Sequence, residues 1–297
     1  MNARMLFRGT GTALVTPFTP DDKVDEKALR RLIDIQIGAG IDALIVLGTT
    51  GENPNVSDDE RRHIVDVAVE QAAGRVPVVI GTGNNSTRAS IEYSRQAVAA
   101  GADALLVVGP YYNKPMQSGF YRHVAEIASA ADAPIILYNV PGRTSFNFTA
   151  ETTLRIAADI PQVVGVKEAS ASIAQISDVL AGRPDGFAVY SGDDEFALPV
   201  TLLGGDGVVS VVSNAMPGRF TRMIAHALDG NLADARRLHF EMLEAMRACF
   251  RETNPIPIKA ALADAGIISG GLRLPLEEIS DANRERVLEV FRPLVEK

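Results

Sequence analysis

Short apolar runs alternate with longer amphipathic segments along most of the chain. Runs of aliphatic and β-branched residues predict buried strands, and apolar residues spaced three and four apart predict helices. One unit shows the pattern: a helix is predicted at 25–37, an apolar strand at 43–47, a polar loop at 48–52 and a helix-opening capping box at 57–60. Because the strands are apolar on both faces, we expect a parallel sheet covered by helices.

Eight strands are predicted in this way, with helices between them. They lie at 11–17, 43–47, 76–80, 104–108, 134–138, 163–166, 187–190 and 207–212. The ten residues at 39–48 are echoed at 100–109, an offset of about 60 residues that equals two strand–helix units. This repeat fits the module of an eightfold barrel, and the count of eight units favours a closed (β/α)8 TIM barrel over the alternative, a doubly wound open sheet.

The last part of the chain has no predicted strand. From about Thr221 onward, helices are predicted at 223–228, 233–250, 256–262 and 284–290. We therefore expect the barrel to occupy residues 1–220 and an appended C-terminal helical bundle to occupy residues 221–297 and pack on the barrel.

Composition narrows the class of protein. The 297 residues carry a net charge of −8, which disfavours a nucleic-acid-binding surface. The single cysteine, Cys249, excludes an internal disulfide and fits a reducing compartment. No run approaches the ~18 apolar residues of a membrane span, and the charges within residues 1–8 do not fit a secretion signal. We expect a soluble, cytoplasmic protein without a membrane or nucleic-acid partner.

The polar residues that follow the predicted strands are the candidates for a site, because such barrels build their active sites at the carboxyl ends of the strands. Lys167 follows the sixth strand, where apolar neighbours make an amine easier to deprotonate than a surface amine. A neutral amine can attack a ketone and form an imine. The other strand ends contribute Thr49, Thr50, Tyr111, Tyr112, Tyr138, Arg143, Ser191, Gly192, Asp193, Val209 and Ser210.

Each of these residues also has an ordinary structural interpretation. The lysine could extend to solvent, and the threonine pair could fix a turn. The arginine could form a surface ion pair, and the tyrosines at 111–112 could pack at an oligomer contact. However, three of the six tyrosines of the chain fall at these strand ends, and that concentration favours a functional site.

Other chemistries are disfavoured by what the strand ends lack. All four histidines fall in predicted helices, and no His/Cys cluster has the spacing of metal ligands. No Ser-His-Asp set can be assembled at the strand ends. The sequence Gly81-Thr82-Gly83 follows a strand but lacks the third glycine of a dinucleotide-binding loop. The lysine and the hydroxyl groups that remain favour imine chemistry with proton relay.

Several motifs, in order along nearly the whole chain, resemble the dihydrodipicolinate synthase / N-acetylneuraminate lyase superfamily of class I aldolase-type barrels. They are Gly-Thr-Ala-Leu-Val-Thr-Pro-Phe (11–18), Gly-Thr-Thr-Gly-Glu (48–52), Gly-Pro-Tyr-Tyr-Asn (109–113), Tyr-Asn-Val-Pro-Gly-Arg-Thr (138–144), Gly-Val-Lys-Glu-Ala-Ser (165–170), Ser-Gly-Asp-Asp (191–194) and Asn-Pro-Ile-Pro-Ile-Lys (254–259). The threonine pair, the double tyrosine and the arginine after Asn-Val-Pro are most similar to the dihydrodipicolinate synthase family.

This resemblance implies an activity and its catalytic residues. The expected reaction condenses pyruvate with L-aspartate 4-semialdehyde and gives 4-hydroxy-tetrahydrodipicolinate, for lysine and diaminopimelate biosynthesis. Lys167 would form an imine with pyruvate, which tautomerises to an enamine. Tyr138 would donate and accept protons, and Thr49 and Tyr112 would complete a hydroxyl relay in which Tyr112 comes from a neighbouring subunit.

The resemblance also implies how the substrates are held. Thr50 and the backbone near Gly192 and Val209 would hold pyruvate, and Arg143 would bind the carboxylate of the semialdehyde. The family pairs its active sites across a tight dimer, which implies a homotetramer built as a dimer of dimers. No metal or organic cofactor is expected, because the lysine itself supplies the electron sink.

Two other functions stay open. The same chemistry could serve another acceptor, as in a 4-hydroxy-2-oxoglutarate aldolase, a keto-deoxy-sugar aldolase or dehydratase, or an N-acetylneuraminate lyase. Arg143 discriminates between them, because a sugar acceptor needs hydroxyl-binding groups instead. A non-catalytic barrel that binds a 2-keto acid is a more remote hypothesis, since such a protein would not need the lysine and the whole relay.

Lysine feedback is a further expectation from the resemblance. Family members that lysine inhibits carry polar and histidine residues in a cleft at the dimer contact. Asn85 and Tyr111 match that cleft, whereas Asp58, Arg61 and Ala89 do not. We therefore expect lysine inhibition to be weak or absent.

Overall fold

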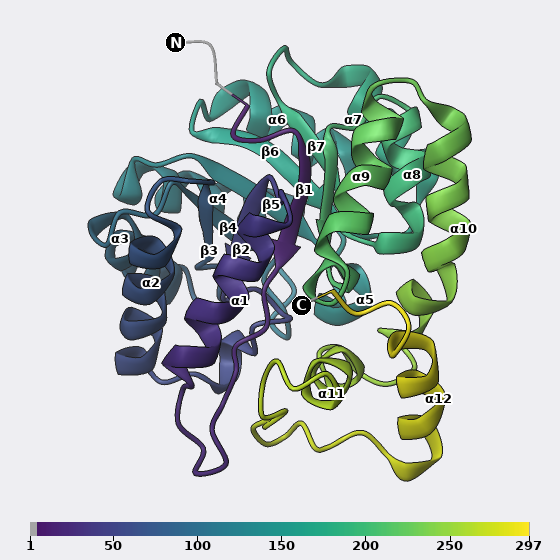
Figure 1. Cartoon of the computed structure of the whole chain (residues 1–297). Coiled ribbons are helices and arrows are strands. Elements are labelled where there is room, and N and C mark those ends of the chain that lie inside the picture. The colour runs from purple at the N-terminus through teal and green to yellow at the C-terminus, as the bar shows by residue number, and fades with distance from the viewer. Residues whose placement is uncertain (1–4, 297) are drawn as a thin grey trace.

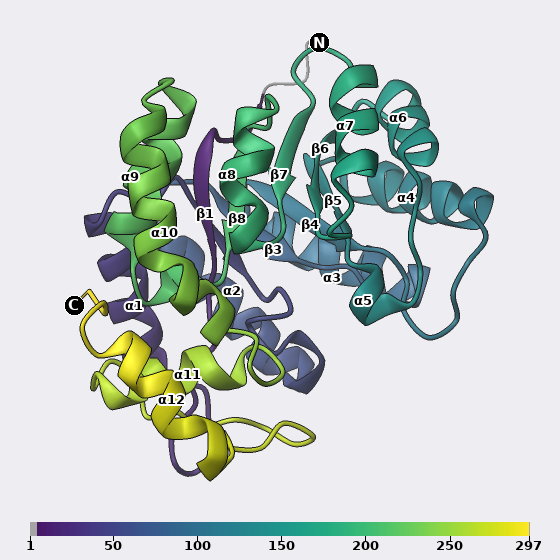
Figure 2. The same ribbon diagram turned by 90° about the vertical axis from the view of Figure 1, so that its right-hand side faces the viewer.

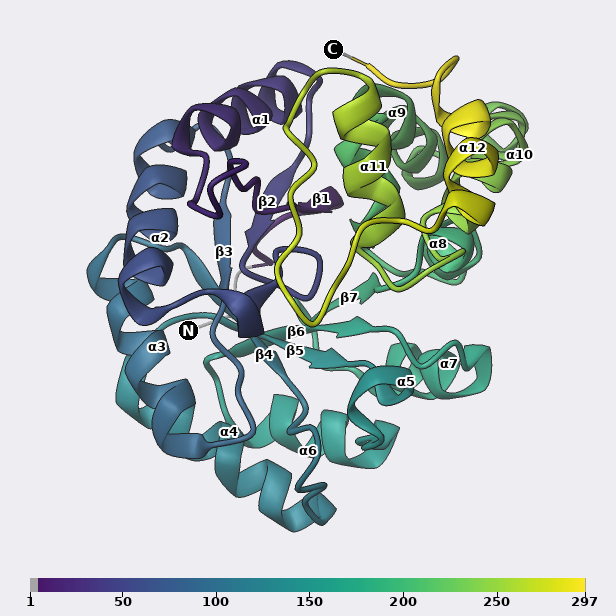
Figure 3. The ribbon, with the colours of Figure 1, turned by 90° about the horizontal axis from the view of Figure 1, so that it is seen from below.

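The computed structural model describes residues 5–296, in which eight parallel strands close into a barrel in sequential order (Figure 3). Each strand pairs with the next, and the eighth pairs with the first. The predicted (β/α)8 barrel is therefore confirmed over the open sheet. The strands are β1 (Gly9–Ala13), β2 (Ala43–Val46), β3 (Val78–Gly81), β4 (Ala104–Val108), β5 (Ile135–Asn139), β6 (Val163–Glu168), β7 (Ala188–Ser191) and β8 (Gly207–Ser210).

Helices surround the barrel and join successive strands (Figures 1 and 3). The predicted capping box is present, because the Ser57 side chain accepts from the backbone N–H of Glu60 while the Glu60 carboxylate accepts from that of Ser57. The helices of the barrel are α1 (Glu26–Gly38), α2 (Asp58–Ala72), α3 (Thr87–Ala99), α4 (Gln117–Ala131), the short α5 (Pro141–Thr144), α6 (Ala150–Asp159), α7 (Ile173–Gly182) and α8 (Asp194–Leu202), with single turns of 3-10 helix at η1 (Asn53–Asn55) and η2 (Val212–Asn214).

Both faces of every strand are buried, which explains their continuous apolar sequence. Side chains that point outward pack under the helices and form the larger core. Side chains that point inward fill the barrel, among them Ile45, Leu106, Ile136 and Val209. The strand arrows in Figure 1 point toward the end of the barrel where α5 lies, so the carboxyl-end loops gather there.

The chain after β8 continues as four helices, α9 (Pro217–Leu228), α10 (Leu232–Ala248), α11 (Ile256–Asp264) and α12 (Asp281–Phe291). Helix α9 packs against β1, α1 and α8, as the helix of an eighth barrel unit would, and α10 packs beside it (Figure 2). The boundary expected at residue 220 falls inside α9. We propose that the appended part begins after α9, and Figure 1 shows α11 and α12 at the carboxyl end of the strands.

Two expectations from composition concern the membrane. Within residues 5–296, no helix is both long enough and apolar enough to span a bilayer. The charges within residues 1–8 argued against a secretion signal. The first four of these residues lie outside the described part of the chain.

Candidate active site

Lys167 and Tyr138 face each other inside the carboxyl end of the barrel. They are direct register partners on neighbouring strands, Lys167 on β6 and Tyr138 on β5. The Lys167 Nζ lies 4.1 Å from the centre of the Tyr138 ring. Their exposed fractions are 4% and 5%, so an amine and a phenol meet where little water reaches them. The structure thus brings together the two residues on which the imine hypothesis depends.

The next pair along these strands, Asn139 and Glu168, points to the opposite face of the sheet. The Asn139 Nδ2 donates to both carboxylate oxygens of Glu168, at 3.1 and 3.0 Å. Gln175 Nε2 donates to Glu168 Oε2 at 3.0 Å, and the backbone N–H of Ser170 donates to Oε1 at 2.8 Å. The sequence analysis did not predict this network. The available signal was that a polar residue, Asn139 or Glu168, directly follows each of the two inward-facing candidates.

Gly192 lies in the loop after β7, directly beside the lysine. A Cβ atom added to this glycine would lie 3.2 Å from Lys167 Cε and 2.6 Å from the Cβ of Ala169. The missing side chain therefore lets the backbone approach the amine. The Gly192 N–H donates to the carbonyl of Glu168 at 2.8 Å, which fixes the loop to the end of β6.

The end of β8 is held by a buried carboxylate. Asp194 Oδ2 accepts from the backbone N–H groups of Val211 at 3.1 Å and Val212 at 2.8 Å. Burial raises the pKa of Asp194 to about 6. Val209, two residues earlier than Val211, is 1% exposed and its side chain packs in the barrel interior with Tyr138.

The threonine pair after β2 divides between two environments. Thr49 is half-buried and lines a cavity of about 380 Å³, together with Tyr138. Thr50 is 3% exposed, and its hydroxyl accepts a hydrogen bond from Asn254 Nδ2 at 2.9 Å. The two neighbouring threonines therefore differ: Thr49 lines the cavity, and the Thr50 hydroxyl is hydrogen-bonded to the C-terminal part of the chain.

Arg143 lies on α5 at the rim of the same cavity and is exposed. Its Nη2 donates to the backbone carbonyl of Asn254 at 3.2 Å. Asn254 therefore contacts both Thr50 and Arg143, and it belongs to a motif for which sequence reasoning gave no role. Lys167 is not among the described residues that line the cavity, but the ring beside its amine belongs to Tyr138, which does line it.

Tyr112 is placed differently from the other candidates. Its side chain is 90% exposed on the β4–α4 loop, with a φ of 68°, and it is not among the described residues that line the cavity. Its neighbour Tyr111 does line the cavity. Within a single chain, the structure does not bring Tyr112 to Lys167, so a role in the relay requires a second subunit.

The glycines of Gly81-Thr82-Gly83 serve packing. A Cβ atom at Gly81 would lie 2.0 Å from the carbonyl oxygen of Leu47, and one at Gly83 would lie 2.3 Å from the backbone nitrogen of Val108. Close approach of neighbouring strands thus accounts for both glycines without a phosphate ligand. Within residues 5–296, no cluster of three His, Cys, Asp or Glu side chains is placed to hold a metal ion.

A closed (β/α)8 barrel with a buried amine beside a phenol at the carboxyl ends of its strands defines a class I aldolase-type barrel, an enzyme that can form a Schiff base. Residues 6–292 match the model of the dihydrodipicolinate synthetase family. The chain belongs to this family.

Individual relatives agree with this assignment over nearly the full chain. The chain is 60% identical to a 4-hydroxy-tetrahydrodipicolinate synthase of Salinibacter ruber, covering 98% of this chain and 97% of the relative. A monomeric dihydrodipicolinate synthase variant matches with a TM-score of 0.96 at 44% identity, covering 98% of each chain. A chloride-inhibited dihydrodipicolinate synthase from Acinetobacter baumannii, complexed with pyruvate, matches with a TM-score of 0.95 at 38% identity, covering 97% of this chain and 99% of the other.

Proposed function

We propose that this chain condenses pyruvate with L-aspartate 4-semialdehyde and forms 4-hydroxy-tetrahydrodipicolinate, on the route to diaminopimelate and lysine. The observation that carries the proposal is the Lys167 Nζ 4.1 Å from the centre of the Tyr138 ring, in the barrel of this family. The pyruvate complex of the Acinetobacter relative supports pyruvate as the first substrate. The arginine at the rim supports a second substrate that carries a carboxylate.

The chemistry begins with attack of the Lys167 amine on the keto carbon of pyruvate. Loss of water from the resulting carbinolamine gives the imine, and loss of a methyl proton gives the enamine. The enamine carbon attacks the aldehyde and forms the new carbon–carbon bond. The amino group of the semialdehyde then attacks the imine carbon and displaces Lys167, which closes the ring and frees the amine for the next cycle.

Tyr138 acts as the proton donor and acceptor in these steps, because its phenol adjoins the amine. Thr49 lies on the same cavity and passes protons between Tyr138 and Tyr112 of a second subunit. The exposure of Tyr112 at 90% and Met116 at 79% on one loop supports a subunit contact there. The proposed assembly is a homotetramer, built as a dimer of dimers and located in the cytoplasm.

Substrate binding uses groups at the carboxyl ends of four different strands. Thr50 and the backbone at Gly192 and Val209 hold the carboxylate and the reacting centre of pyruvate, and Arg143 holds the carboxylate of the semialdehyde. The space beside Lys167 that Gly192 leaves supports this arrangement. Burial of the amine also keeps bulk water from hydrolysing the imine before the acceptor arrives.

A coupled assay with pyruvate and L-aspartate 4-semialdehyde tests the proposal. We expect turnover with this pair and at least about a hundredfold lower kcat/KM for the cleavage of 4-hydroxy-2-oxoglutarate, keto-deoxy sugars and N-acetylneuraminate, which releases pyruvate. Equal or faster turnover of one of those compounds would assign the chain to another acceptor within the superfamily. Pyruvate binding with no turnover of any acceptor would instead support the non-catalytic barrel.

A further inference from the structure

A fully buried ion pair joins the loop after β2 to the C-terminal helices. Lys259 on α11 donates from Nζ to Glu52 Oε1 at 2.5 Å, and both side chains are 0% exposed. Of the ion pairs found among residues 5–296, this is the one in which neither side chain is exposed at all. Neither residue touches the cavity described above.

Both members of the pair also form hydrogen bonds to backbone groups. The Lys259 Nζ donates to the carbonyl of Thr16 at 2.9 Å and lies 4.4 Å from the centre of the Phe18 ring. Glu52 Oε2 accepts from the backbone N–H of Arg273 at 3.2 Å. The pair therefore connects four segments of the chain: the β1–α1 loop, the β2 loop, α11 and the loop after it.

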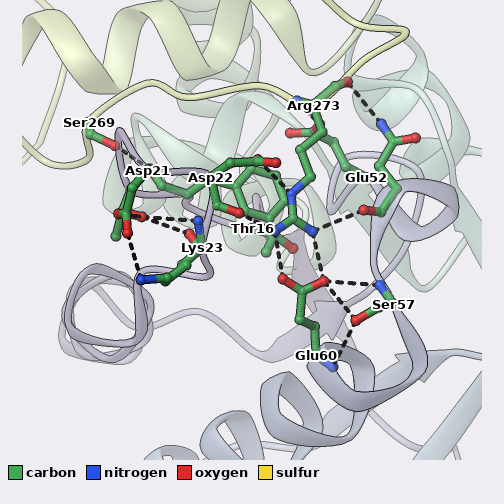
Figure 4. Close-up of polar contacts among 12 residues, drawn as sticks. Thr16, Asp21, Asp22, Lys23, Glu52, Ser57, Glu60, Ser269 and Arg273 are labelled. Carbon is green, nitrogen blue, oxygen red and sulfur yellow. Dashed lines mark hydrogen bonds and ion pairs between the residues drawn. The ribbon is translucent and has the colours of Figure 1, made fainter.

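Arg273 closes this cluster from the outside. Its guanidinium group lies 4.1 Å from the centre of the Phe18 ring and hydrogen-bonds to both carboxylate oxygens of Glu60, at 2.8 and 2.6 Å. Figure 4 shows the group between Asp22 and Glu60. Arg273 holds the pKa of Glu60 down at about 2, so the outer pair stays charged across the physiological range.

The buried pair lies only a few residues from the proposed relay. Glu52 follows Thr49 and Thr50 after one glycine and has a left-handed backbone, with a φ of 53°. Thr16 Oγ1 donates to the carbonyl of Gly51 at 2.7 Å, so the turn is held from both sides. Thr49, which lines the cavity, therefore lies three residues before a glutamate that is held by a buried partner.

Stability alone does not account for a charged pair at this place. Removing two charges from water costs about as much as their attraction returns, and apolar residues of equal volume often stabilise as well or better. Burial lowers the pKa of Lys259, and the neighbouring Glu52 opposes that shift. A buried ion pair does, however, fix one geometry, because each charge must remain on its partner.

We propose that the Glu52–Lys259 ion pair positions the Thr49–Thr50 turn for catalysis, so that α11 holds part of the active site in place from outside the barrel. Asn254, just before α11, adds a second tie through its hydrogen bond to the Thr50 hydroxyl. Glu52 and Lys259 touch no reacting atom and are positioning residues. The catalytic consequence rests on the proposed function, whereas the anchoring of the turn does not.

The experiment compares the full-length wild type with Glu52→Gln, Lys259→Met and the double variant. The control is Val287→Ala on α12, which removes buried apolar volume away from the turn. The first readout is amide hydrogen exchange of residues 47–56 by mass spectrometry. The second is kcat and KM in the coupled assay, and the third is trapping of pyruvate by borohydride.

We expect exchange of residues 47–56 to rise about tenfold or more in both single variants but not in Val287→Ala. We expect kcat to fall about a hundredfold, with a much smaller change in the KM for pyruvate, because the relay hydroxyl is displaced while the amine remains. The double variant, which leaves no unpaired charge, should lose less than the product of the two single losses. If a single variant fails to fold, the exchange and kinetic measurements are made on the double variant instead.

Unchanged exchange at 47–56 in both the single and the double variants would overturn the proposal, and so would an equal rise in Val287→Ala. Raised exchange together with a wild-type kcat would show that the ion pair has only a structural role, and this result would also overturn the proposal. If the wild type itself traps no pyruvate and turns over no acceptor, the proposed function fails. The exchange data would then still decide whether the pair anchors the turn.

Discussion

The side-chain amide of Asn139 donates to both carboxylate oxygens of Glu168, directly behind the pair formed by Tyr138 and Lys167. The contact joins the carboxyl ends of β5 and β6 on their outer face. It lies above a bulge, because the register of the two strands shifts between Ile135 and its neighbour Ile136. The hydrogen bonds therefore secure the register that places the amine beside the phenol.

Replacing Glu168 by alanine tests this relationship. The change removes a charged acceptor from the buried amide of Asn139 and from the half-buried amide of Gln175, both of which keep Asn147 Oδ1 as an acceptor. We expect it to lower the free energy of unfolding by about 2 kcal/mol. We also expect borohydride trapping of pyruvate to slow about tenfold or more. Denaturant unfolding and mass spectrometry measure the two effects. The exposed Glu151→Ala on α6 is the control, and trapping at the wild-type rate in Glu168→Ala would refute the positioning role.

Arg143→Met should separate the two substrates. The exposed guanidinium group lines the cavity rim, whereas Lys167 is buried in the barrel. We expect trapping of pyruvate to stay at the wild-type rate and kcat/KM for L-aspartate 4-semialdehyde to fall about a hundredfold, because a charge-assisted hydrogen bond to the carboxylate is lost. Arg155→Met, an exposed arginine on α6, is the control. An equal loss in the trapping step would show that Arg143 acts on pyruvate as well.

His123 makes the stability of the fold depend on pH. Burial lowers the pKa of His123 to about 4, from an ordinary value of 6.5. Its Nδ1 pairs with the Thr87 hydroxyl at 2.9 Å, and its buried Nε2 has no partner among the described residues. Between these two pKa values the unfolded chain takes up a proton that the folded chain does not. The free energy of unfolding should therefore fall as pH falls below 6.5, by about 2 kcal/mol at pH 5.

The variant His123→Gln isolates this contribution, because glutamine does not titrate. We expect its unfolding free energy to decline less between pH 7 and pH 5 than that of the wild type, by about the same 2 kcal/mol. Urea unfolding at a series of pH values measures the difference, with His226→Gln as the control. Parallel pH profiles for the wild type and His123→Gln would contradict the assignment.

L-lysine should inhibit this enzyme weakly or not at all. Arg61 lines the cavity beside Tyr111, is 6% exposed, and its guanidinium carbon lies 4.0 Å from the centre of the Tyr93 ring. Its positive charge disfavours a second cation in this part of the cavity. The coupled assay with L-lysine, added up to a concentration well above that of the substrates, measures the effect. Strong inhibition at low lysine concentration would contradict the expectation.

Most of the barrel could be predicted from the sequence because its signals are local. Continuous apolar strands and the echo of residues 39–48 at 100–109 predict parallel units of fixed size, and the structure closes eight of them. The placement of α9 could not be predicted in the same way. Its sequence is amphipathic like that of the helices after it, and only packing against β1 and α1 shows that it completes the barrel.

Part of the candidate site could likewise be predicted from local sequence, and part could not. Lys167 and Tyr138 end apolar strands, so their inward position follows from strand position alone. The roles of Glu52, Lys259 and Asn254 depend on contacts across 204 to 207 residues of sequence, which no local pattern reveals. The burial of Lys259 runs against the ordinary preference of lysine for solvent, and only the partner supplied by the fold makes it possible.

Borohydride reduction in the presence of pyruvate shows whether the buried Lys167 amine forms an imine. We expect one reduced pyruvate unit per chain, mapped by peptide mass spectrometry to Lys167, and none in Lys167→Met. An unmodified wild-type chain, or an adduct on Lys259 or a surface lysine, would refute imine formation at Lys167.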